Sequence, residues 1–254
     1  MNAITFALIS FSAILAGTAL GFYLGQRLPK EELTSDSRDS IKMAWGIMAT
    51  MAALVLSLLL ASAKTSFDTI NGEMTPSAAK IIVLDRIMAM YGPETAPARE
   101  ELRQTVAAKI QKMWPSTKTG VTASASLADG SGMENVEKRL NELVLANDVQ
   151  RAMLVQARPL CTDLLLQRWL VIEQASTAVP SVFFVVLVAW LVMLFIGIGL
   201  FAPLNRTVLV TLILCNLSFS AAIFLIDEMN HPLDGMIQVS GAPMVEALKQ
   251  LGKP

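Results

Sequence analysis

The sequence predicts an all-α integral membrane protein with four transmembrane helices, arranged in two pairs that flank a polar helical domain. Four apolar runs, at about 4–24, 43–63, 179–203 and 207–226, support this prediction. None contains Asp, Glu, Lys, Arg or His, and each reaches the ~20 residues that a helix needs to cross the hydrocarbon core. Of 254 residues, 54% are hydrophobic and 16% are charged, against ~25% charged in an ordinary soluble domain. Because water cannot satisfy backbone amides inside a bilayer, the runs must be helices.

These runs divide the chain into four parts. Residues 1–63 form the first helix pair, 64–178 the extramembrane domain, 179–226 the second helix pair and 227–254 a C-terminal tail. Within the domain, the spacing of apolar residues predicts helices over about 76–91, 97–114 and 133–157, with a loop over 115–132. Thr75 and Pro76 are typical of a helix start, and Pro159 should break or kink the chain before a last helix toward the third run.

Two stripes of small residues, repeated every four positions, predict close helix contacts. This spacing removes side chains from one helix face and lets another backbone approach. We expect the first two spans to pair through these faces, with a contact between subunits as the alternative. The residues are Gly17, Gly21 and Gly25 in the first span and Ala49, Ala53 and Ser57 in the second.

The distribution of charge predicts an orientation and argues against one class of ligand. Residues 64–179 carry 13 basic and 13 acidic side chains, so no basic face is available for nucleic acid. Short loops rich in Lys and Arg stay in the cytoplasm, which would place the N-terminus and the central domain outside it. No Lys or Arg precedes the first run, which favours an uncleaved span over a signal peptide. The loop residues are Arg27, Lys30, Arg38, Lys42 and Arg206.

No pattern of residues predicts an enzyme. The one histidine, His231, has no second histidine or cysteine near enough for a zinc site. Cys161 and Cys215 form no disulfide framework, because Cys215 lies inside an apolar run. No run contains an ionisable residue that would mark a proton relay or a coupled transporter. We therefore expect no catalytic residue, no metal and no cofactor.

The candidate ion-pathway residues lie in the fourth run and just after it. Asn216 and Ser220 form a polar pair near the bilayer middle, which either hydrogen-bonds to another helix or faces water. Asp227, Glu228 and Asp234 follow the run, and copies brought together by symmetry would form a negative mouth that attracts cations. The alternative is that these acids only end the helix in water.

Several segments share a pattern with a known family. They are Ala63-Lys64-Thr65-Ser66-Phe67, Leu84-Asp85, Tyr91-Gly92-Pro93-Glu94, Trp114-Pro115, Phe224-Leu225-Ile226-Asp227, Asn230-His231-Pro232-Leu233-Asp234-Gly235-Met236-Ile237-Gln238-Val239-Ser240 and Pro243. Together they resemble the bestrophin-like domain family of prokaryotic membrane proteins over nearly the whole chain, and the last segments resemble its closing signature most specifically.

The family is likened to bestrophins, which are oligomeric anion channels with two helix pairs around a helical domain. The resemblance implies a pore-forming homo-oligomer in the bacterial inner membrane, with the lipid bilayer, further copies of the chain and inorganic ions as partners. Two features depart from bestrophins. The second span lacks the aromatic cluster of their narrow neck, and their middle domain is cytoplasmic. We expect a passive ion channel, with a non-conducting interaction or envelope-sensing protein as the alternative.

Overall fold

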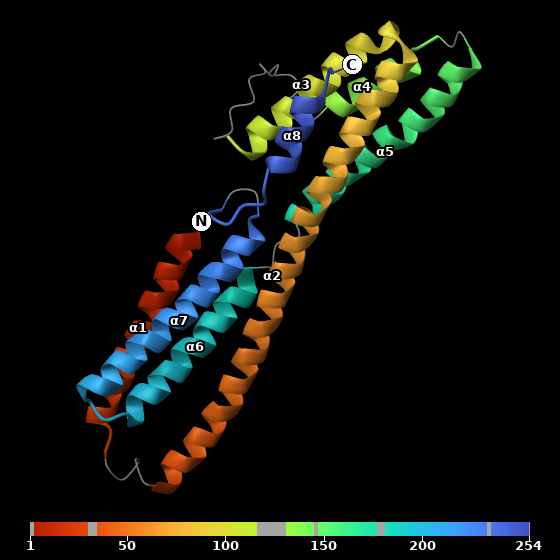
Figure 1. The fold of residues 1–254 in the computed structure, drawn as a ribbon. Helices are drawn as coiled ribbons and strands as arrows, with labels where there is room; N and C mark the ends of the chain where they lie inside the picture. The colour runs from red at the N-terminus through yellow and green to blue at the C-terminus, as the bar shows by residue number, and fades with distance from the viewer. Residues whose placement is uncertain are drawn as a thin grey trace. The chain divides into compact units, whose positions relative to one another are not determined.

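The computed structural model describes residues 3–29, 35–115, 131–144, 147–176, 181–232 and 235–253, without the side chains of 35–38, 171–176 and 181. These residues form helices and no β-strand (Figure 1). The predicted loop over 115–132 falls mostly outside them. The helices are α1 (Ala3–Arg27), α2 (Ser35–Tyr91), the 3-10 helix η1 (Pro93–Thr95), α3 (Ala96–Met113), α4 (Gly132–Asn141), α5 (Asp148–Ser176), α6 (Ser181–Phe201), α7 (Arg206–Asn230) and α8 (Ala242–Gln250).

Four of these helices are long and apolar enough to cross a membrane. They are α1, α2 from Asp39 onward, α6 from Val182 onward and α7, and each overlaps one of the apolar runs. The prediction of an all-α protein with four such helices is therefore confirmed. Their arrangement as two pairs stays a prediction.

The chain divides into two compact units. The first comprises residues 1–66, 177–231 and 235–237, and thus contains α1, the first part of α2, α6 and α7. The second comprises residues 67–176, 232–234 and 238–254, and thus contains the rest of α2, α3, α4, α5 and α8. Part of the segment expected to be a tail therefore belongs to the helical domain.

In the first unit, α1 packs on α6 and α7, which lie alongside it in Figure 1. Its glycine face contacts α6. A Cβ atom at Gly21 would lie 2.2 Å from the carbonyl oxygen of Ile196, and one at Gly25 would lie 2.6 Å from that of Leu200. The glycine stripe therefore packs on α6 rather than on the second span, which corrects the expected partner. The reason is that α6 contributes Gly199, so two backbones meet with no side chain between them.

Helix α2 is one continuous helix, although the sequence predicts a new helix at Thr75. Pro76 lies inside it on the exposed side, and a Cβ at Gly72 would meet nothing within 4 Å. The Gly72 carbonyl, which loses its i+4 donor to the proline, is therefore not enclosed by packing. A buried stripe continues past this point, through Ile70, Met74, Ala78 and Ile81, and keeps the helix whole.

The predicted helix over 133–157 is two helices, because α4 ends at Asn141 and α5 begins at Asp148. Asn147 caps the start of α5, where its Oδ1 accepts a hydrogen bond of 2.8 Å from the backbone N–H of Gln150. Pro159 does not break α5. Like Pro76 it lies on the exposed side, while Ala157 and Cys161 continue the buried stripe.

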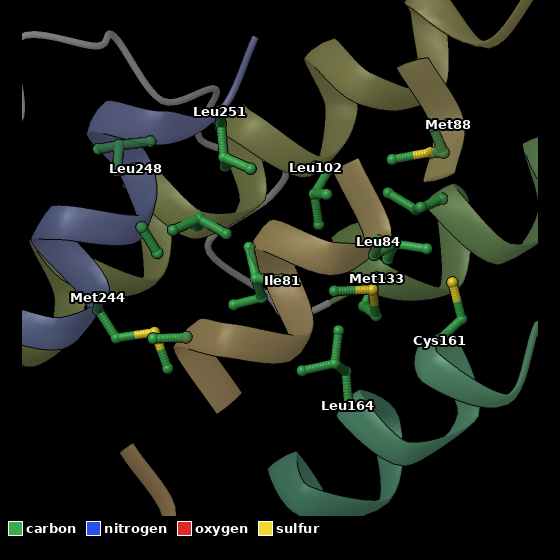
Figure 2. Close-up of a cluster of buried hydrophobic side chains, with 14 of the residues drawn as sticks. Ile81, Leu84, Met88, Leu102, Met133, Cys161, Leu164, Met244, Leu248 and Leu251 are labelled. Atoms are coloured by element: carbon green, nitrogen blue, oxygen red, sulfur yellow. The ribbon is translucent and has the colours of Figure 1, made fainter. Parts of the chain in front are cut away.

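The second unit has one hydrophobic core, to which α2, α3, α4, α5 and α8 all contribute (Figure 2). Leu84 of α2, Leu102 of α3 and Cys161 of α5 are fully buried in it. Helix α8, which the sequence did not predict, places Met244 and Leu248 in the same core. The spacing of these two side chains, with Ala247 and Leu251, was an available helical signal.

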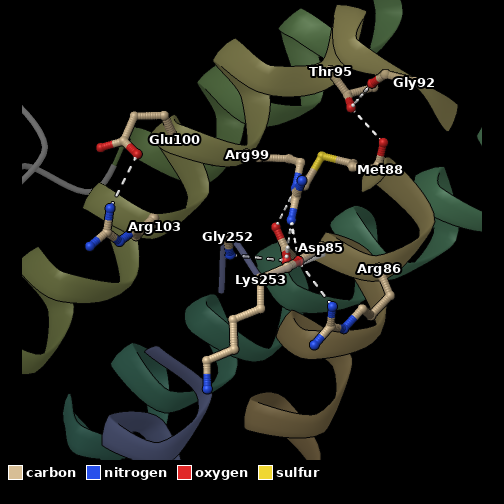
Figure 3. Close-up of polar contacts among 10 residues, drawn as sticks. All are labelled: Asp85, Arg86, Met88, Gly92, Thr95, Arg99, Glu100, Arg103, Gly252 and Lys253. Carbon is tan, nitrogen blue, oxygen red and sulfur yellow. Dashed lines mark hydrogen bonds and ion pairs between the residues drawn. The ribbon is translucent and has the colours of Figure 1, made fainter. Parts of the chain in front are cut away.

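A buried ion pair fixes the end of the chain to this core (Figure 3). Arg99 donates to both carboxylate oxygens of Asp85, at 2.8 and 3.0 Å. Asp85 also accepts from the backbone N–H of Gly252 at 3.2 Å, while Arg86 and Arg99 donate to the Lys253 carbonyl at 2.9 and 3.0 Å. The hydrogen bond to Asp85 raises the pKa of Arg99 above its ordinary value, although partial burial opposes the rise.

The glycine contact predicts a large difference between two Gly→Ala substitutions. Gly21→Ala should destabilise the protein by about 1–3 kcal/mol, because the new methyl group overlaps a backbone carbonyl that cannot rotate away. Gly46→Ala is the matched control, since a Cβ there meets nothing within 4 Å. The measurement is the thermal unfolding midpoint of both variants in one detergent, and equal midpoints would contradict the contact.

Candidate functional site

The polar pair of the fourth span lies between helices. The Ser220 hydroxyl donates to the Ala7 carbonyl of α1 at 2.7 Å, and the Asn216 amide donates to the Phe11 carbonyl at 3.2 Å. Both side chains are buried. Of the two alternatives left open by the sequence, contact with another helix describes this geometry. These bonds tie α7 to α1 at neighbouring turns.

Glu228 holds the turn that follows α7. Its carboxylate accepts from the backbone N–H groups of Met236 and Ile237, the latter at 3.2 Å, and its side chain is buried. A Cβ at Gly235 would lie 2.3 Å from the same carboxylate, so a side chain there would displace it. Glu228 is thus engaged by the protein, and Asp234 lies outside the described residues.

Asp227 is the less enclosed acid at this end of α7. Its carboxylate lies 3.9 Å from Nδ1 of His231, and 16% of its side chain is exposed. The same ring nitrogen donates to the Asp227 backbone carbonyl at 2.9 Å, which requires the proton on Nδ1. Of the acids proposed for a mouth, Asp227 is the one in the described part of the chain with a partly open carboxylate.

The membrane part of α2 has three different faces. One face is buried or partly buried, and Trp45 on it packs over Gly197, with its ring centroid 5.6 Å from that of Phe201 of α6. A second, exposed face carries large apolar side chains, namely Met43, Ile47, Met51, Leu54 and Leu58.

The third face of α2 is exposed and made mainly of small uncharged residues. Successive turns present Gly46, Ala49, Thr50, Ala53 and Ser57, with Leu60 as a large neighbour. Nothing lies within 4 Å of a Cβ at Gly46, and the Thr50 hydroxyl donates to the Gly46 carbonyl at 2.9 Å. The sequence predicts a helix contact for Ala49, Ala53 and Ser57, and within one chain these residues are uncovered. We call this surface the small face of α2.

A tryptophan of the domain secures the segment that follows α7. The Trp114 indole donates to the Val239 carbonyl at 2.8 Å, and the Val239 N–H donates to the Pro232 carbonyl at 3.0 Å. A Cβ at Gly241 would lie 2.7 Å from the Trp114 ring. Composition and spacing predict no role for Trp114, Val239 or Gly241, and the family resemblance is the signal that identifies this part of the sequence.

The described residues offer no grouping suited to a metal ion. Within them, no group of three His, Cys, Asp or Glu side chains is placed to hold a metal ion. Burial raises the pKa of Cys161 to about 12, so its thiol is protonated at neutral pH. A shallow pocket of about 180 Å³ beside Glu94, Arg139 and Glu142 is smaller than the roughly 300 Å³ at which ligand sites begin.

Comparison with known proteins supports one family. The family model described as Bestrophin-like domain matches residues 12–244. Neither the curated proteins nor the solved structures give a match. The matched range includes α2, the Asp85 ion pair, Trp114 and the turn held by Glu228. The chain therefore belongs to the Bestrophin-like domain family.

Proposed function

We propose that this protein is a passive ion channel, formed by several copies of the chain around a pore that the small face of α2 lines. One observation carries the proposal: α2 crosses the membrane region with an exposed face of small, uncharged residues beside a separate face of large apolar ones. Membership of the Bestrophin-like domain family is a second argument for a channel.

We assign the small face to a pore because contact with lipid does not need small residues. Large apolar side chains such as Ile47 and Leu54 suit contact with acyl chains. Small residues instead let helices approach, or leave room between several helices that surround an axis. Thr50 and Ser57 would add hydroxyl oxygens to such a lumen. Because the face lacks ionisable groups, conduction there would be passive.

A second exposed stripe on α7, formed by Thr211, Cys215 and Ser218, is the weaker candidate. The hydroxyls of Thr211 and Ser218 donate to their own helix at 2.9 Å, as that of Thr50 does in α2. We favour α2 because the likened bestrophins place their narrow neck in the second span. Small residues in that place would make a wider neck here.

The acids after α7 are proposed to form the pore mouth. Asp227 and Asp234 would concentrate cations there when several copies converge. Glu228 contributes its charge to the same end, although backbone N–H groups already bind its carboxylate. A cation preference would set this protein apart from the anion-conducting bestrophins.

The rival proposal is a non-conducting protein in which the domain binds a partner or senses the state of the envelope, and the helices only anchor it. A homo-oligomer in the bacterial inner membrane fits both. Under both we keep the orientation that the loop charges predict, with the N-terminus and the domain outside the cytoplasm.

The pore assignment predicts that bulk on the small face blocks flux. Ala53→Trp should lower ion flux from liposomes by about ten-fold or more, because an indole ring from each copy would fill the lumen. Leu54→Trp, one residue along on the large apolar face, should leave flux within about two-fold of wild type. Equal flux in the two variants would remove α2 from the pore wall. Wild-type flux no greater than that of empty liposomes would favour the anchor proposal.

The mouth assignment predicts a change in selectivity. Replacing Asp227 and Asp234 by Asn should lower the cation-to-anion permeability ratio by about two-fold or more, because the local cation concentration falls. Reversal potentials in a salt gradient measure this ratio. Asp148→Asn is the control, because Asp148 is an exposed acid at the start of α5. An unchanged ratio would remove both acids from the pathway.

The orientation predicts on which side a cysteine at position 249 reacts. Lys249 is exposed on α8, so Lys249→Cys should react with a membrane-impermeant maleimide in intact cells. Wild type is the control, since Cys161 is buried with a raised pKa and Cys215 lies in an apolar span. Labelling only after the membrane is permeabilised would place the domain in the cytoplasm, as in bestrophins.

A further inference from the structure

Helix α5 has an exposed apolar face outside the membrane segments. Val155, Leu166 and Trp169 are 65%, 57% and 56% exposed, and they recur at helical spacing with the exposed Ala152 and Pro159. From Val155 to Leu170, which is also exposed, this face runs for about 22 Å at 1.5 Å per residue, with the exposed Thr162 and Asp163 at its middle. We call it the apolar face of α5. A largely apolar strip of this length on a water-exposed domain marks an interaction surface.

Other sides of α5 contact the rest of the second unit. Leu154, Ala157 and Leu164 point into the domain core. Gln167 binds Ser77 and Glu73 of α2 at 2.8 and 2.9 Å. The Arg168 guanidinium lies 5.5 Å from the centre of the Trp169 ring and helps to order it. The apolar face is therefore held in place by the domain without being covered by it.

The domain part of α2 offers a second exposed surface, which includes Pro76. Gly72 and Ala79 are exposed there, and a Cβ at Gly72 would meet nothing within 4 Å. Val83 continues this surface and is 48% exposed. A helix with large side chains packs closely on one with small residues, because the side chains of the first fill the space that the second leaves.

We propose that the apolar face of α5 in one copy packs on residues 72–83 of α2 in the next copy. The contact joins two different surfaces, so repeating it leads around a ring, which is the arrangement a pore requires. The proposal rests on the homo-oligomer of the proposed function and names its contact outside the membrane. A neighbour anchored in the same bilayer presents its own α2 at the same height as this α5.

The size of the face favours a second copy over a soluble partner. A strip of about 22 Å by ~10 Å offers roughly 220 Å², whereas a stable complex of free proteins buries about 800 Å² on each partner. Copies that share a membrane contact each other at high local concentration, so a small contact suffices. The bilayer is a poorer occupant, because its headgroup layer is only ~6 Å thick on each side.

Cross-linking between two differently tagged chains tests the contact. One chain carries Leu166→Cys and the other Ala79→Cys, both with Cys215→Ala, and they are co-expressed and treated in membranes with a short bis-maleimide. We expect a cross-linked species that contains both tags. Lys138→Cys, exposed on α4, replaces Leu166→Cys in the matched control and should give at least about ten-fold less of this species.

A second variant separates the contact from folding. Val155→Glu with Trp169→Glu, both placed in the chain that carries Leu166→Cys, should abolish the mixed-tag species and leave the helical circular dichroism unchanged, because both side chains are exposed within one chain. Unaltered cross-linking in this variant would overturn the proposal.

Four other results would also overturn it, and they differ in what they say of the channel. Absence of the α5–α2 species from an oligomer that still conducts would leave the proposed function intact. Products that join position 166 to itself would show a two-fold contact instead. Shielding of a cysteine at position 166 by liposomes, without any cross-link, would identify the bilayer as the occupant. A chain that stays monomeric and carries no flux would refute the proposed function as well.

Discussion

The absence of water from the hydrocarbon core is the constraint on which the first unit depends. It forces each apolar run into a helix, and it favours hydrogen bonds from polar side chains of the runs to backbone carbonyls. The hydroxyls of Thr18, Thr50, Thr211 and Ser218 donate to the carbonyl one turn earlier in their own helix. Asn216 and Ser220 donate instead to α1, which makes them specific links between two helices. The glycine face of α1 adds direct backbone contact with α6.

This use of polar and small groups distinguishes α2 from its neighbours. The small residues of α1 are occupied by α6, and the buried amide and hydroxyl of α7 are occupied by α1. The small face of α2 is uncovered within one chain, and so is the surface near Gly72 and Ala79 farther along the same helix. The uncovered surfaces of α2 and α5 are thus the parts of the described chain that further copies could complete, and both proposals begin from them.

The contacts within each unit show what the family signature does physically. Asp85 holds Arg99 and the backbone of Gly252, Trp114 holds Val239, and Glu228 holds the turn at Met236 and Ile237. These residue types suit their places because each buried donor or acceptor needs a partner, and an unpaired one costs about 1–3 kcal/mol. The signature positions described here therefore fix the chain's C-terminal segment.

The sequence by itself determined the four apolar helices, the approximate end of the first domain helix at Gly92 and the extent of α3, because these follow from hydropathy, helical spacing and local stop signals. It did not reveal that Pro76 and Pro159 lie within continuous helices, since buried stripes on the opposite sides outweigh a local breaker. Nor could it tell that Gly21 meets Ile196, that Asn216 faces α1 or that Ala53 is uncovered. Spacing says which residues share a helix face, and only the packing of distant segments decides what that face meets.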